Sequence, residues 1–319
     1  MGFTFSIVCL LGWGLADLFY KKSSDEDDKY SHLKIAVWVG LVMGICALIL
    51  IPFAENITSV KSLAVYAVKY FPASLSYIVS MVIGYAGLRY LEVSIVSPVQ
   101  NSSGGLAAVA MMIWFISCGK FTSISEEFSY LDIVGTVMCV LGVVLLAVVE
   151  NHISKASMSQ SEKKLAHSAK ALIFPILYCI FDTIGTAADG IILDEDTGLG
   201  LGEIDVIVLY GLTFMIMGII AWVYMRIRSG RAYNPFTKSE LATKGAAALF
   251  EEFGQIFYVF AMAKNPVLAA PVVASYCIVS VILSRIFLKE KLEKSQYICV
   301  TLVIVGIVIL GISEGLAEM

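Results

Sequence analysis

The chain has 319 residues, of which 59% are apolar and only 15% are charged, and its mean hydropathy is +0.85. A soluble domain usually carries about 25% Asp, Glu, Lys and Arg, so these values exclude a water-soluble fold. The net charge of −4 also argues against a nucleic-acid partner, because polyanion binding requires a surplus of basic residues.

Ten apolar segments follow one another along the chain, each close to the roughly 20 residues that one membrane-spanning helix needs. They cover residues 2–20, 33–53, 70–90, 94–117, 130–149, 170–193, 204–226, 243–263, 266–288 and 295–313. The first segment has neither a basic start nor a cleavage motif, so we interpret it as a helix and not as a signal peptide. The sequence thus predicts an all-α integral membrane protein with ten transmembrane helices.

The ten helices divide into two sets of five. The predicted units are a first repeat at 1–149, a polar linker at 150–169 and a second repeat at 170–319. Three short segments align in the same order in both halves: 11–17 with 176–182, 96–99 with 269–272, and 139–145 with 303–309. Asp17 is thereby paired with Asp182, and Pro98 with Pro271. Because each half has an odd number of spans, the alignment predicts an inverted repeat; chance similarity between apolar helices is the alternative.

Three sequence elements have the pattern of a known family. They are Leu11-Gly12-Trp13-Gly14 in the first helix, the proline-containing starts of the fourth and ninth helices, and Phe287-Leu288-Lys289-Glu290-Lys291-Leu292 before the last helix. In these elements the chain resembles EamA-type members of the drug/metabolite transporter superfamily. The joint at 117–121 in the first half departs from the pattern, because it lacks the glutamate. The resemblance implies a ten-helix transporter whose solute is an amino acid, nucleoside, sugar or lipophilic drug.

The basic residues are distributed unevenly between the two sides of the predicted membrane protein. Of the 22 Lys and Arg residues, all but Lys61, Lys69, Lys120 and Lys264 lie in or beside the joints after helices one, three, five, seven and nine. The positive-inside rule then puts both termini outside, whereas the family resemblance implies termini in the cytoplasm. We expect a multi-pass protein of the cytoplasmic membrane of a prokaryote, as a monomer or a homodimer.

Carboxylates within the apolar segments are the first candidate functional residues, because a charge in the bilayer costs a few kcal/mol or more. Asp182 lies in the middle of the sixth helix, where a structural hydrogen bond is its alternative role. Glu251 and Glu252 are adjacent, and since successive helical side chains point about 100° apart, at most one of them faces a central cavity. Asp17 and Asp189 lie closer to helix ends, so an interfacial position is the alternative for both.

Polar and aromatic residues on the same helices complete the predicted solute-binding or proton-coupling set. They are Trp13, Tyr77, Asn101, Tyr178, Gln255, Tyr258 and Tyr276. Aromatic faces attract organic cations, although packing is the alternative role for each aromatic residue. Asn101 belongs to a polar run that follows Pro98, which we expect to bend the fourth helix. The cavity itself is expected between the halves, lined by helices one, three, four, six, eight and nine.

Together these features predict a secondary transporter that moves a small organic metabolite or drug-like solute by alternating access. Protonation of Asp182, Glu251 or Glu252 would couple the movement to a proton gradient. The alternatives are a channel or a non-transporting membrane partner protein and, less favoured, an intramembrane enzyme. The chain has no Walker A loop, no histidine within an apolar segment and no cysteine spacing typical of zinc or haem, so we expect no cofactor, metal site or catalytic residue.

Overall fold

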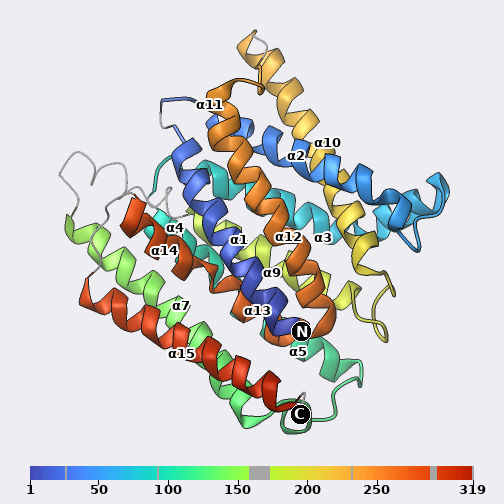
Figure 1. The fold of residues 1–319 in the computed structure, drawn as a ribbon, viewed down its shortest axis with the longest axis vertical. Coiled ribbons are helices and arrows are strands. Elements are labelled where there is room, and N and C mark those ends of the chain that lie inside the picture. The colour runs from blue at the N-terminus through green and yellow to red at the C-terminus, as the bar shows by residue number, and fades with distance from the viewer. Residues whose placement is uncertain (26, 92, 158–172, 231–232, 288–292, 318–319) are drawn as a thin grey trace.

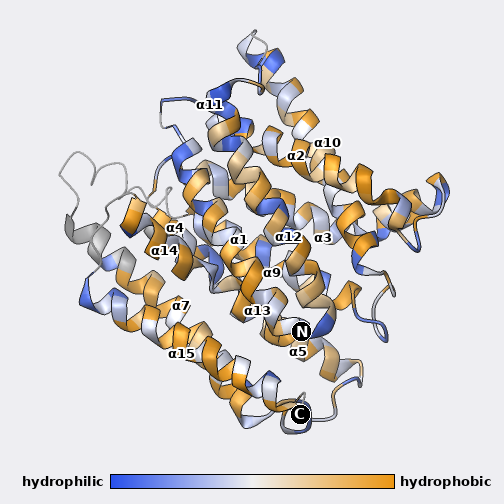
Figure 2. Cartoon of the chain, viewed as in Figure 1, coloured by the Kyte–Doolittle hydropathy of each residue, from blue (hydrophilic) through white to orange (hydrophobic). Residues whose placement is uncertain are grey.

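A computed structural model describes residues 1–317 except 26, 92, 158–172, 231–232 and 288–292. Within the described residues, ten helices are long and apolar enough to cross a membrane. Figure 2 shows apolar residues along the lengths of these helices and hydrophilic residues gathered at their ends and in the joints. This arrangement confirms the predicted fold class, an all-α integral membrane protein that crosses the bilayer several times.

The elements follow one another in an order that matches the predicted spans. They are α1 (Gly2–Ser23), α2 (Ser31–Leu50) with η1 (Ile51–Phe53), α3 (Val60–Gly87), α4 (Val93–Asn101), α5 (Ser103–Ser117), α6 (Ile124–Glu127), α7 (Tyr130–Ser157), α9 (Ile173–Ile192), α10 (Glu203–Ser229), α11 (Lys238–Glu240), η2 (Leu241–Gly245), α12 (Ala246–Lys264), α13 (Pro266–Ala274), α14 (Tyr276–Phe287) and α15 (Lys294–Ala317). Helix α6 lies in a joint, and α11, η2 and α12 together make one span.

Two helices extend furthest beyond their predicted ends. Helix α3 begins at Val60, well before the predicted start at residue 70, because the side chain of Ser59 accepts a hydrogen bond from the Ser62 backbone N–H at 3.1 Å and caps the helix. Helix α7 continues to Ser157 and so enters the predicted linker. The rest of that linker, and residues 288–292 of the family motif, lie outside the described residues.

The fourth and ninth spans are each interrupted in the middle. Helices α4 and α5 meet at Ser102, and helices α13 and α14 meet at Ser275, one turn after Pro98 and Pro271 respectively. Proline cannot donate a backbone hydrogen bond, so the chain bends. At both interruptions the serine hydroxyl donates to the proline carbonyl, at 3.1 Å for Ser102 and 2.8 Å for Ser275. The fourth span is thus interrupted where we predicted a bend, and an equivalent interruption follows Pro271.

The helices pair in a pattern that is unchanged when the two halves are exchanged. Helix α1 packs along α12, while its predicted counterpart α9 packs along α3, the counterpart of α12 (Figure 1). The remaining large contacts join counterparts directly, α2 with α10 and α7 with α15.

Close contacts between α7 and α15 have the same reciprocity. A Cβ atom on Gly142 would lie 2.3 Å from Val303, and one on Gly306 would lie 2.9 Å from Cys139. The predicted alignment pairs Gly142 with Gly306 and Cys139 with Val303, so exchanging the halves turns one contact into the other. These reciprocal contacts support the predicted repeat.

Both ends of the chain lie on the same side of the molecule, as an even number of spans requires (Figure 1). The Met1 amino group contacts the Glu314 carboxylate at 2.9 Å. We call this side the terminal face; it also carries the joints at 54–59, 118–129 and 193–202. The opposite side, with the joints at 24–30, 88–91 and 233–237, is called the basic face.

Candidate functional site

A cavity lies where the two halves meet. It is lined by the six predicted spans, namely α1, α3, α4 with α5, α9, α12 and α13 with α14, and additionally by Tyr210 of α10. All predicted candidates except Glu252 and Asp189 are among its lining residues: Trp13, Asp17, Tyr77, Asn101, Tyr178, Asp182, Glu251, Gln255, Tyr258 and Tyr276.

Asp17 is half-buried and is held by two serine side chains. Ser97 of α4 donates a hydrogen bond to Asp17 Oδ2 at 2.6 Å, and Ser280 of α14 donates to the same oxygen at 2.8 Å. Both serines belong to the interrupted spans, one in each half. Asp17 therefore connects α1 to the two helices that are bent by proline.

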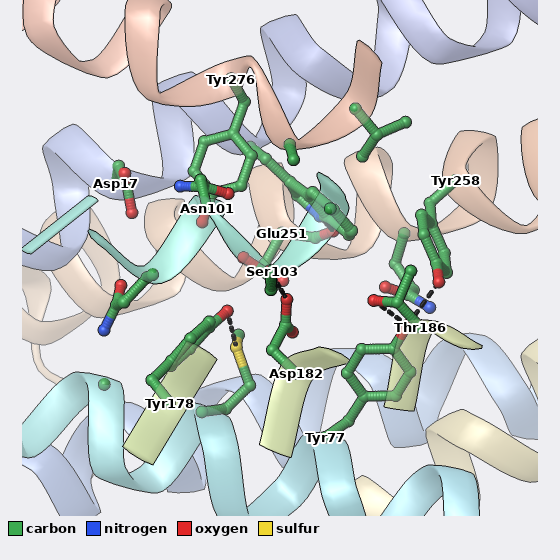
Figure 3. Close-up of a pocket in the computed structure, with 18 of the residues that line it drawn as sticks. Asp17, Tyr77, Asn101, Ser103, Tyr178, Asp182, Thr186, Glu251, Tyr258 and Tyr276 are labelled. Carbon is green, nitrogen blue, oxygen red and sulfur yellow. Dashed lines mark hydrogen bonds between the residues drawn. The ribbon is translucent and has the colours of Figure 1, made fainter. Parts of the chain in front are cut away.

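Asp182 is held in a similar way, from the opposite half. Ser103, the first residue of α5, donates a hydrogen bond to Asp182 Oδ2 at 2.6 Å. Figure 3 shows Asp182 pointing toward Ser103, with Tyr178 on one side and Tyr77 on the other. The serine partners Ser97, Ser103 and Ser280 were not predicted as site residues, because only the tertiary structure brings them to the aspartates.

Glu251 is connected to α1 and α3 through a chain of hydroxyl groups. Tyr20 donates to Glu251 Oε2 at 3.1 Å, and Tyr85 donates to the Tyr20 hydroxyl at 3.2 Å. The Trp13 indole N–H donates to the Glu251 backbone carbonyl at 3.2 Å. Tyr20 was not among the predicted residues, because its position beside Lys21 is typical of an interfacial tyrosine.

Glu252, which we predicted as a solute-binding or proton-coupling candidate, does not line the cavity. Its side chain is on the side of α12 that faces α2, near Cys46. The Oε1 atom of Glu252 makes no hydrogen bond to any described residue. The helical geometry thus directs only Glu251 into the cavity, as we expected for two adjacent side chains.

Aromatic rings form one wall of the cavity. The Trp13 ring centroid lies 5.1 Å from that of Tyr258 and 5.6 Å from that of Tyr276, and Tyr77 meets Tyr258 edge to face at 6.3 Å. Such geometries are favourable for aromatic pairs, and the rings hold one another in place.

Two glycines allow aromatic rings to pack directly against a helix backbone. A Cβ on Gly254 of α12 would lie 2.3 Å from the Trp13 indole, and a Cβ on Gly84 of α3 would lie 2.8 Å from the Tyr178 ring. Trp13 and Tyr178 are aligned in the predicted repeat. Each therefore lies against a glycine of a helix from the other half, a further reciprocal contact.

The cavity is acidic. Asp17, Asp182 and Glu251 line it, and none of its described lining residues is Lys, Arg or His. The side-chain nitrogens of Gln100 and Gln255 are buried without a hydrogen-bond partner among the described residues. The arrangement therefore offers negative charge together with amide donors that remain available to a ligand.

The chain was compared with protein-family models, solved structures and curated proteins. Residues 197–312 match the model of the EamA-like transporter family, which confirms the predicted resemblance. A solved structure described as "Crystal structure of protein" has a TM-score of 0.62 to this chain, covers 99% of it and 98% of its own length, and is 12% identical in sequence. At this identity the likeness concerns the fold alone, over the whole chain. No curated protein matches the chain.

Proposed function

We propose that this EamA-type chain is a secondary transporter that carries a small organic solute across the membrane by alternating access. The matched family is one of transporters, and the observation that carries the proposal is the acidic cavity between the two halves. A site at the interface of two repeats can open to either side when one half moves relative to the other.

The solute is an organic cation or a zwitterion. Asp17, Asp182 and Glu251 attract positive charge, and the Trp13 and Tyr258 rings add cation–π attraction of about 0.5–2 kcal/mol each. A zwitterion would in addition place its acceptor group near the unpartnered amides of the cavity. An anion is disfavoured, because the described cavity lining contains no basic side chain to compensate it.

Protons compete with the solute for the same carboxyl groups. Carboxylates that share a poorly hydrated cavity repel one another, so protonation stabilises the cavity when no solute is bound. A cationic solute releases such a proton when it takes its place, and this competition couples solute movement to the proton gradient. The bends at Ser102 and Ser275 are hinges that allow the walls to move.

Ligand binding to the purified protein tests this assignment. A thermal-shift panel of organic cations, zwitterions and anions identifies the class, since a ligand at a hundred times its Kd adds about 2.7 kcal/mol of stability. We expect cations or zwitterions to raise the Tm of the wild type and of Glu252→Gln, whose side chain lies outside the cavity. We expect no rise in Asp182→Asn. An equal shift in Asp182→Asn, or a response to anions alone, would contradict the proposal.

A further inference from the structure

A fourth carboxylate, Asp189, lies beyond the cavity toward the terminal face. It is completely buried, although its place near the end of the helix favoured an interfacial position. Tyr70 of α3 donates a hydrogen bond to Asp189 Oδ1 at 2.7 Å. The other oxygen, Oδ2, has no hydrogen-bond partner among the described residues. The Oδ2 atom of this buried carboxylate is therefore available to bind a ligand.

Further hydroxyl groups surround this carboxylate. The side chains of Tyr77 and Tyr258 also lie near Asp189. Tyr77 donates to Thr186 Oγ1 at 3.1 Å, and the Tyr77 and Tyr258 hydroxyls hydrogen-bond to each other. These three residues also line the solute cavity, and Figure 3 shows them together at one end of it. The hydroxyls thus connect the cavity to Asp189, which itself does not line the cavity.

Nothing basic compensates the Asp189 charge within the described part of the chain. The titratable groups near it are Tyr70 and Tyr77 of α3, Tyr258 of α12, Tyr210 of α10, and Asp182, about two turns earlier on α9. The adjoining Gly190 packs against Met111, Met262 and Pro266, which contribute apolar atoms at this point. A buried charge without a partner is strongly unfavourable.

We propose that this cluster is a binding site for a monovalent cation, Na⁺ or a proton, which adjoins the solute cavity and shares Tyr77, Thr186 and Tyr258 with it. Its members are Asp189, Thr186 and the hydroxyls of Tyr70, Tyr77 and Tyr258. Oxygen atoms are the ligands that hard cations prefer, and a single carboxylate matches a single positive charge. The free Oδ2 atom is the position at which Na⁺ is coordinated or the proton is carried.

Occupancy of this site has a conformational consequence. Tyr70 and Tyr77 belong to the first half of the chain, whereas Asp189, Thr186 and Tyr258 belong to the second. The bound cation removes the uncompensated charge and so stabilises the arrangement in which these helices meet toward the terminal face. Loss of the cation favours their separation. The site therefore favours closure of the terminal side, and its role in transport rests on the proposed function.

Thermal unfolding of the purified full-length protein in detergent, without any solute, tests the site. The probes are NaCl against choline chloride at constant ionic strength, and proton concentration in a series of buffers. We expect NaCl to raise the wild-type Tm by several degrees if Na⁺ is the occupant, and Asp189→Asn to lose that rise. If the occupant is a proton, NaCl has no effect, and the wild type loses Tm on alkalinisation more steeply than Asp189→Asn.

Three variants separate this site from the solute cavity. Asp182→Asn and Glu252→Gln should keep the Asp189-dependent response, because neither residue is part of the cluster. Tyr70→Phe retains the ring but removes a ligand, so it should need several-fold more of the cation for the same shift. If Asp189→Asn responds like the wild type to both Na⁺ and pH, the proposed cation site is wrong. That result would leave solute binding by Asp182 unaffected, so the two proposals fail separately.

Discussion

The carboxyl groups of this protein differ in their hydrogen-bond partners. Asp17 and Asp182 are held by serines, and Glu251 and Asp189 by tyrosines. These neutral partners leave the negative charge uncompensated inside the protein. Asp194, which lies outside the membrane, has an ion pair with Lys120 instead. Neutral partners are thus associated with the interior, where the cation that we propose as the solute would supply the missing charge.

The Lys120–Asp194 pair gives a prediction about stability and pH. Partial burial alone would raise the pKa of Asp194, but hydrogen bonds from Lys120 and Thr197 outweigh it and lower this pKa below its usual value. A lowered carboxyl pKa stabilises the folded state above the unfolded pKa, and this stabilisation is lost as the pH falls through the folded pKa.

We therefore expect Lys120→Met to destabilise the protein by about 1 kcal/mol at neutral pH. The difference from the wild type should vanish in strong acid, where Asp194 is protonated in both proteins. The measurement is Tm in detergent at the two pH values. Lys61→Met, which removes an exposed lysine from the same face, is the control. A difference that persists in acid would show that lost packing, and not the ion pair, accounts for the effect.

The residues predicted from the sequence are those whose chemistry is unusual for their position. Asp182 and Glu251 are recognisable because a charge rarely occurs within an apolar helix. Ser97, Ser103 and Ser280 were missed, because a serine in a membrane helix is common and only tertiary contact makes it a partner.

At the scale of helices, close packing of aromatic rings on glycine sets the shape of the cavity. A Cβ on Gly254 would overlap the Trp13 indole at 2.3 Å, whereas a Cβ on Gly315 of α15 meets nothing within 4 Å. The Trp13 ring in turn contacts Tyr258 and Tyr276. A change at Gly254 is therefore transmitted directly to the aromatic wall.

We expect Gly254→Ala to destabilise the protein by roughly 1–3 kcal/mol, the usual effect of overpacking, and to weaken solute binding as Trp13 is displaced. Gly315→Ala is the matched control and should be neutral or slightly stabilising, because alanine favours a helix. Chemical or thermal unfolding measures the first effect, and the ligand thermal shift measures the second. Equal behaviour of the two variants would contradict the packing account.

Hydropathy alone located all ten spans but not every helix boundary. The first turns of α3 carry Lys61 and Lys69, so an apolar-segment search begins the helix too late, whereas the Ser59 cap determines where it starts. The prolines predicted the bend in the fourth span. The sequence did not predict the hydrogen bonds that the Ser102 and Ser275 hydroxyls donate to the Pro98 and Pro271 carbonyls.

For the whole molecule, the pairing of helices explains why the cavity lies where it does. Exchange of the two halves leaves the principal contacts α1–α12 and α3–α9 equivalent, so the binding site forms between two similar units. The hydroxyl cluster around Asp189 breaks this equivalence, because it occurs toward the terminal face. Such a difference is what a transporter needs if a second ion is to favour closure on one side.

The central claim is that one cavity opens alternately to the two faces, and the accessibility of Ser103 tests it most directly. Ser103 is only 1% exposed, so any labelling there requires the cavity to open. The measurement uses Ser103→Cys in a variant without the seven native cysteines, reconstituted in vesicles and treated with a membrane-impermeant thiol reagent from each side.

The account predicts labelling from either side, with a bound solute increasing reactivity on one side and decreasing it on the other. Labelling from one side only under all conditions would contradict alternating access. Reactivity from both sides that rises together, with unsaturable permeation of the solute, would instead indicate a channel.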